Sequence, residues 1–176
     1  PDLDLVLISA NHDDASLATY IYGSAEVVGL MCLRAFLADE RDRYARYDAM
    51  APGARRLGAA FQKVNFLRDF GVDSGDLGRT YLTGLDPADP RDDAWHRWLD
   101  DVDTDLAAAA TIIPDLPIGS RIAVCTAHDL FAELAVGLRG VPAAEAARRR
   151  IRVSTPGKVR IAAAAMARRG RPRVAA

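Results

Sequence analysis

Hydrophobic residues recur at helical spacing over most of the chain, and short stretches rich in proline, glycine or charge separate these segments. Apolar residues three and four positions apart are typical of amphipathic helices. The spacing predicts helices over residues 14–38, 54–73, 92–113 and 120–138, and a last one that begins near Pro156. Asp13 or Asp14 is expected to cap the first helix, because a carboxylate accepts hydrogen bonds from free N–H groups. Pro52-Gly53 is expected to break the chain before the second helix, and residues 74–78 are expected to form a loop after it.

The composition favours a single all-α domain. Of the 176 residues 33 are alanine, the strongest helix former, whereas β-branched residues rarely alternate with polar ones. A hydrophobic fraction of 50% and a charged fraction of 27% exclude a disordered or low-complexity chain. The net charge of -1 gives no general attraction to nucleic acid, so we predict no nucleic-acid partner.

Cysteine content and hydropathy bear on the location of the protein. Cys32 and Cys125 cannot make a disulfide framework, and we predict that both are reduced thiols in a cytoplasmic protein. The longest largely apolar run, residues 106–113, is only 8 residues long, well short of the roughly 20 that a membrane span needs. The chain begins at Pro1 with neither a methionine nor a secretory signal pattern, and we expect further sequence to precede it.

The segment from Leu57 to Tyr81 carries the candidate chemistry. On a helix with about 100° per residue, four of its polar side chains fall within about 80° of one another: Gln62, Asn65, Asp69 and Asp73. Carboxylates four residues apart repel each other, so a cation is expected between or beyond them. Mg²⁺ takes oxygen ligands from carboxylates and phosphates, and Arg68, Lys63 and Arg79 would hold the remaining phosphate oxygens.

A structural interpretation of the same face stays open. Most D-x-x-x-D spacings on helices belong to solvated faces whose carboxylates pair with arginine or lysine. The amides of Gln62 and Asn65 favour a binding face, since solubility does not require them. Gly71 favours it too, because a glycine inside a helix costs about 1 kcal/mol that a purely structural helix would have little reason to tolerate.

Three blocks carry a family resemblance. The pattern Q-x-x-N-x-x-R-D-x-x-x-D over residues 62–73, followed by Arg79-x-Tyr81, resembles the second aspartate-rich signature of the squalene and phytoene synthase family. The block YIYGSAEVVGLMCLRAF over residues 20–36 resembles the family's other signature. The run through RIAVCTAHDLFAEL to RRRIRVSTPGK resembles its closing helices. The similarity covers about residues 3–165, and the amino-acid sequences of the blocks are most similar to those of bacterial phytoene synthases.

The resemblance implies an all-α isoprenoid-synthase fold with a central cavity. It also implies a prenyltransferase that joins two allylic diphosphates head to head, with Mg²⁺ or Mn²⁺ as cofactor. In the phytoene branch, two geranylgeranyl diphosphates give prephytoene diphosphate and then phytoene, in carotenoid biosynthesis. Carried over by position, Asp69, Asp73 and Asn65 would hold the metal.

Further roles are implied by the same resemblance. Gln62, Asn65, Arg68 and Arg79 would contact the diphosphate, and the two arginines would assist its departure. Tyr20 would face the reacting carbons, where its ring can stabilise positive charge. The carbocation left behind must be kept from water, which calls for an apolar cavity wall; the candidates are Val27, Val28, Leu30 and Met31.

The N-terminal end departs from the family pattern. The family carries a first D-x-x-x-D on an earlier helix, and the early aspartates of this chain lack that spacing. We therefore expect a bundle that is incomplete at the N-terminus, with residues 1–165 as the C-terminal part of a synthase-like domain. A missing N-terminal segment or a partner chain would supply the first motif, and the isolated chain is expected to have little activity. A C15-using squalene or dehydrosqualene-type synthase, and a non-catalytic helical subunit or relic, remain alternatives.

The C-terminal end is basic. Ten basic residues and no acidic one lie between Arg148 and Arg173, and we expect residues 166–176 to form a disordered, solvated tail. Peripheral contact with an anionic membrane is the alternative for this tail. Arg150 and Lys158 match basic positions of the family's last segment and would reach a diphosphate. Glu26 is expected either near the metal or at a solvated rim.

Overall fold

The computed structural model describes the backbone of residues 14–76, 82–86, 88–148 and 150–172. Within these ranges every regular element is a helix, which confirms the all-α class. The α-helices are α1 (Asp14–Ile21), α2 (Val27–Phe36), α3 (Arg43–Asp76), α4 (Asp92–Ile112), α5 (Ile118–Arg139), α6 (Ala143–Ala146) and α7 (Thr155–Ala167). A π-helical turn, Tyr22–Glu26, joins α1 to α2, and a 3-10 turn, Ile113–Asp115, comes directly after α4.

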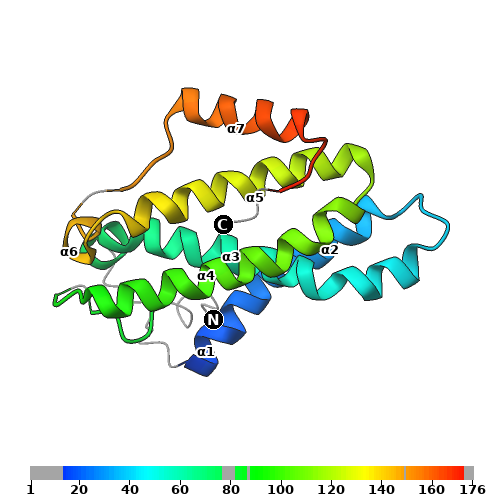
Figure 1. Cartoon of the computed structure of the whole chain (residues 1–176). Coiled ribbons are helices and arrows are strands. Elements are labelled where there is room, and N and C mark those ends of the chain that lie inside the picture. The colour runs from blue at the N-terminus through cyan, green and yellow to red at the C-terminus, as the bar shows by residue number, and fades with distance from the viewer. Residues whose placement is uncertain (1–13, 77–81, 87, 149, 173–176) are drawn as a thin grey trace.

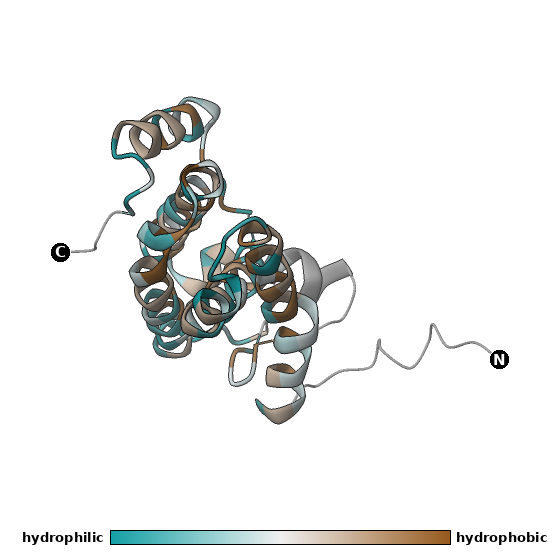
Figure 2. Cartoon of the chain, turned by 90° about the vertical axis from the view of Figure 1, so that its right-hand side faces the viewer, coloured by the Kyte–Doolittle hydropathy of each residue, from teal (hydrophilic) through white to brown (hydrophobic). Residues whose placement is uncertain are grey.

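Helix α3 forms the centre of the arrangement (Figure 1). Helices α4 and α5 pack on it and on each other, and the α1–α2 segment crosses it. Helix α7 packs on the outer side of α5, at the edge of the bundle (Figures 1 and 2). The long central helix therefore positions α2, α4, α5 and α6, whereas α7 is held by α5.

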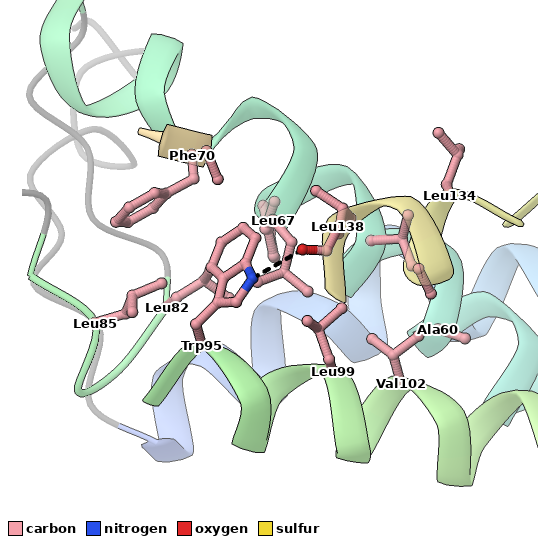
Figure 3. Close-up of a cluster of buried hydrophobic side chains, with 14 of the residues drawn as sticks. Ala60, Leu67, Phe70, Leu82, Leu85, Trp95, Leu99, Val102, Leu134 and Leu138 are labelled. Carbon is pink, nitrogen blue, oxygen red and sulfur yellow. Dashed lines mark hydrogen bonds between the residues drawn. The ribbon is translucent and has the colours of Figure 1, made fainter. Parts of the chain in front are cut away.

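The main core lies between α3, α4 and α5 (Figure 3). Trp95 is fully buried there, its ring 5.9 Å from that of Phe70, and its Nε1 donates a hydrogen bond of 3.2 Å to the carbonyl of Leu138. Trp98 donates a similar bond to the carbonyl of Thr83. Both indoles thus bury a large apolar body with a satisfied N–H group, which fixes α4 against its neighbours.

The predicted break at Pro52-Gly53 is wrong, because α3 runs through both residues without interruption. A proline inside a helix removes one backbone hydrogen bond. Pro52 lies on the exposed side of α3, where water can satisfy the freed carbonyl. The predicted loop over residues 74–78 is wrong in part, since the helix continues to Asp76.

Two glycines allow the α1–α2 segment to cross α3 closely. A β-carbon at Gly58 would overlap the carbonyl of Ala25, and one at Gly29 would overlap the carbonyl of Ala54. The crossing lies next to the π-helical turn, where the N–H of Val27 bonds the carbonyl of Tyr22. Small residues at a crossing permit close backbone approach, and this crossing brings both signature blocks together.

Gly71 has a structural reason that the sequence does not reveal. A β-carbon there would overlap the backbone carbonyl of Ala147, just after α6. The interpretation of Gly71 as a sign of function is therefore wrong. Its lack of a side chain is what lets α3 pack against this segment.

The predicted disordered tail from residue 166 begins inside a helix. Ser154 caps α7 by accepting a hydrogen bond from the N–H of Gly157, and the helix continues to Ala167. Beyond its end, Arg168 forms an ion pair with the buried carboxylate of Asp129 on α5. This ion pair anchors the chain at Arg168, and the carbonyl of Arg171 accepts a hydrogen bond of 2.8 Å from the same side chain. Residues 173–176 lie outside the described part of the chain.

The stretch Asp14–Phe36 has the length and hydropathy of a membrane-spanning helix, alone among the described residues. The longest apolar run in the sequence does not reveal this stretch, because such a run contains no charged residue and the stretch contains several. Buried core helices and signal sequences share this length and hydropathy, and 17% of the apolar window is buried here. Here Glu26 within the stretch forms an ion pair with Arg55 of α3.

Candidate functional site

Three of the four predicted stripe residues are described with their side chains. Gln62, Asn65 and Asp69 are all partly buried and lie along one face of α3. Asp73 continues the helix one turn beyond Asp69, but its side chain lies outside the described part of the chain, as does all of Arg79. The structure thus bears out the shared face as far as Asp69.

Asp69 is held by two arginines. Nε and Nη2 of Arg68 donate to its two oxygens over 3.1 and 2.7 Å. Arg150 approaches the same two oxygens from the segment after α6, with its Nε 2.7 Å from Oδ1 and its Nη2 3.2 Å from Oδ2. Forked arginine–carboxylate contacts fix both partners in orientation. The pair of guanidinium groups forms a positive cluster beside the stripe, and Arg150 comes from 81 residues away.

An apolar groove begins at the Gln62 end of the stripe. It has a volume of about 320 Å³ and lies between the α1–α2 segment, α3 and the ends of α4 and α5. Val28, Cys32, Leu57, Phe61, Ile112 and Val124 are among its lining residues. Phe61 stacks on Phe131 of α5, with ring centroids 4.0 Å apart. Since Gln62 belongs to both features, the polar stripe and the groove are continuous.

The groove is lined by a different face of α2 than the sequence predicts. Val28 lines it as expected, together with Gly29, Cys32 and Leu33, whereas Val27 and Leu30 do not belong to the lining. Met31 points outward and is strongly exposed. Apolar character alone does not say which residues of α2 face the groove, because the helix also carries apolar side chains on its outward side.

Tyr20 lies on α1, half-exposed, with its ring 6.0 Å from that of Phe66 on α3. Its carbonyl accepts a hydrogen bond of 2.7 Å from Ser24 at the π-helical turn. The structure therefore places Tyr20 against α3, and no described contact links its hydroxyl to Asp69. Its role at the reacting carbons remains a prediction.

Lys63 does not join the stripe, contrary to the expectation that it would hold phosphate. It is buried on the face of α3 that packs on α4, where its Nζ forms ion pairs with Asp101 and, over 2.7 Å, with Asp105. Asp105 is fully buried and also accepts a bond of 2.7 Å from Arg56. This hydrogen bond raises the pKa of the Arg56 guanidinium above its usual value.

These charges line a second cavity of about 540 Å³, together with Arg55 and Glu26. Arg55 donates to Glu26 over 2.6 Å and lies over the ring of Tyr22. Glu26 therefore pairs with Arg55 at this cavity, and no described contact links it to Asp69. The sequence gives no local sign of this network, because its partners are about 40 residues apart and only the helix packing brings them together.

The donor atoms of the stripe suit a hard cation. Carboxylate and amide oxygens are the ligands that Mg²⁺ prefers, and Asp69 and Asn65 supply them on adjacent turns. Within the described residues, no group of three histidine, cysteine or acidic side chains is close enough to hold a metal. In the described arrangement both oxygens of Asp69 are taken by Arg68 and Arg150. Asp69 and Asn65 would become part of a metal site only if a guanidinium group left the carboxylate, and Asp73 and substrate phosphates would have to contribute.

The geometry defines an all-α protein whose polar, arginine-flanked stripe continues into an apolar groove. Such a site suits an amphiphilic ligand with an anionic head. The squalene/phytoene synthase family model matches residues 4–157 of the chain, and the chain belongs to this family of prenyltransferases. No curated protein and no solved structure matches it.

Proposed function

We propose that this chain forms part of a prenyltransferase that condenses two geranylgeranyl diphosphates into prephytoene diphosphate and then phytoene. One observation carries the proposal: the stripe ending at Asp69 is continuous, through Gln62, with the apolar groove. An allylic diphosphate has a charged head and a long hydrocarbon tail. The stripe would bind the head, and the groove would bury the tail away from water.

Asp69, Asp73 and Asn65 would hold Mg²⁺, or Mn²⁺ in its place. The ion would neutralise negative charge on the diphosphate as the carbon–oxygen bond breaks. Arg68 and Arg150 already bracket Asp69. In the substrate complex we expect Arg150, together with Arg79 and Gln62, to bind diphosphate oxygens that the metal does not reach.

The groove would protect the allylic cation once the electron pair of the broken bond has left with the diphosphate. Its lining is apolar apart from the side chains of Ser24, Cys32 and Gln62, so few groups there can add to a cation. The ring of Tyr20 would offer its face to the positive charge. Over the full reaction to phytoene, two diphosphates and two protons leave, and no reductant is required.

Substrate length depends on the depth of the groove. It extends along α3 from Gln62 to Ala54, a rise of about 12 Å at 1.5 Å per residue. Phe36, Ile112 and Leu116 line the far part. The assignment of a C20 substrate rests on the amino-acid sequence of the signature blocks. A C15-using squalene-type synthase is the alternative. A partner chain or a preceding segment would supply the first aspartate motif.

The direct test is incubation of this chain with C20 and C15 allylic diphosphates over a range of Mg²⁺ concentrations, with extracted hydrocarbon identified by mass. We expect little hydrocarbon from the chain alone, because it carries one aspartate motif. A C40 product would support the phytoene assignment and show that one motif suffices, for example in a homodimer. A C30 product alone would contradict the phytoene assignment and favour the squalene type. No hydrocarbon from either substrate would contradict activity of the chain on its own and require a source of the first motif.

A further inference from the structure

Helix α7 has two apolar faces: one packs on α5, and the other is exposed to solvent. Ile161 and Ala165 are buried against α5, as an amphipathic helix requires. On the opposite side Val159 and Met166 are 65% and 57% exposed, and the exposed Ala163 lies between them in helical register. Both figures place α7 at the edge of the bundle (Figures 1 and 2). A helix that is apolar on two faces usually has a second partner.

Basic side chains flank this stripe. Lys158 and Arg160 stand on either side of Val159 in the sequence, and Arg169 and Arg171 come after the helix, all of them exposed. Arg160 has a loose ion pair, 3.6 Å from Glu133. In the described part of the chain no carboxylate pairs with Lys158, Arg169 or Arg171, and the sequence has no acidic residue after Glu145. Apart from Arg160 and Arg168, the described basic residues of this surface have no carboxylate partner, so the surface is positive.

Next to the C-terminal end of α7 lies an arginine-lined hollow of about 620 Å³. Arg121 of α5 and Arg168, Arg169 and Arg171 line it, together with the exposed apolar side chain of Ile118. Two of these arginines are already engaged, since Arg168 pairs with Asp129 and Arg121 donates to the carbonyl of Leu116. The hollow extends the same combination of positive charge and exposed apolar groups beyond the helix.

We propose that the outward face of α7 docks on an anionic phospholipid surface. Basic residues beside an exposed apolar stripe fit the interface of such a membrane, where phosphate groups lie next to acyl chains. A nucleic acid would also be attracted by the positive charge, but α7 has no aromatic residue on which a base could stack. The family match ends at residue 157, so this face lies almost wholly outside the matched region. The proposal does not depend on the catalytic assignment.

Co-sedimentation with vesicles tests the docking. We expect the full chain to bind phosphatidylcholine vesicles that contain about one third phosphatidylglycerol, and to bind pure phosphatidylcholine much more weakly. Each basic residue near such a surface contributes about 1 kcal/mol. The variant Lys158→Gln/Arg171→Gln is therefore expected to lose about thirtyfold in affinity. Added salt should weaken binding, because it screens exposed charges.

Two further variants separate charge from hydrophobic contact. Val159→Gln/Met166→Gln leaves the charge unchanged and is expected to lose about tenfold in affinity through the apolar stripe. Arg91→Gln/Arg97→Gln removes two equally exposed arginines near the start of α4 and should bind like the parent. Equal binding to both vesicle types, or no loss in either α7 variant, would overturn the proposal. Equally tight binding to duplex DNA, insensitive to Val159→Gln/Met166→Gln, would show a general polyanion surface instead.

Discussion

Replacing Asp69 with asparagine is expected to lower turnover in the catalytically competent enzyme by about a hundredfold or more. The substitution keeps the size of the side chain but removes the negative charge that would hold Mg²⁺ against the diphosphate. Steady-state rates at saturating Mg²⁺ measure the effect. Asp73→Asn should act in the same direction, because it belongs to the same helix face.

A structural role of Asp69 must be separated from a metal-binding one, since its carboxylate also orients Arg68 and Arg150. Thermal unfolding monitored by circular dichroism serves this purpose, and we expect helicity to stay intact. Asp48→Asn is the matched control, because Asp48 is an exposed aspartate on the same helix. Near-normal turnover of Asp69→Asn at saturating Mg²⁺ would mean that the stripe does not bind the metal.

The largest expected effect on stability comes from the buried network. Lys63→Met removes one of the two cations that neutralise the fully buried carboxylate of Asp105 and leaves it with Arg56, which is itself half-exposed. Breaking one side of a buried pair costs about 3 kcal/mol. For a chain of this size that corresponds to a melting temperature lower by about 10 °C.

A double variant gives this prediction its control. In Lys63→Met/Asp105→Leu both buried charges are gone, and we expect most of the stability to return, since apolar replacements of buried pairs are often neutral. Arg97→Gln removes an exposed ion pair and should change stability little. If Lys63→Met costs well under about 1 kcal/mol, the network does not stabilise the α3–α4 packing.

Local signals explain which features could be predicted from the sequence. The helices over residues 92–113 and 120–138 are bounded by prolines and glycines, and α4 and α5 match them within one or two residues. The shared face of Gln62, Asn65 and Asp69 depends only on the helical repeat within one segment. That repeat is the same in the folded chain.

Tertiary contacts explain which features could not be predicted. Arg150 reaches Asp69 across 81 residues, and Gly71 is required by the backbone at Ala147. Neither contact produces a recognisable pattern in the local sequence. The lining of the groove by Cys32 and Leu33, and not by Val27 and Leu30, likewise depends on how α2 packs on α3.

Alkylation of Cys32 tests most directly whether the stripe and groove bind a prenyl diphosphate. Cys32 is exposed and lines the groove, whereas Cys125 is buried, and burial raises the pKa of its thiol above the usual value, so it should react slowly. The probes are non-cleavable C15 and C20 prenyl thiodiphosphates. Inorganic diphosphate, which has no tail, is the control ligand.

At about ten times the dissociation constant, we expect either prenyl analogue to slow iodoacetamide labelling of Cys32 by roughly tenfold. Protection should require Mg²⁺, be lost in Asp69→Asn, and be absent with inorganic diphosphate. Labelling of Cys32 at the same rate with and without saturating analogue and Mg²⁺ would contradict the assignment of the stripe and groove as the substrate site.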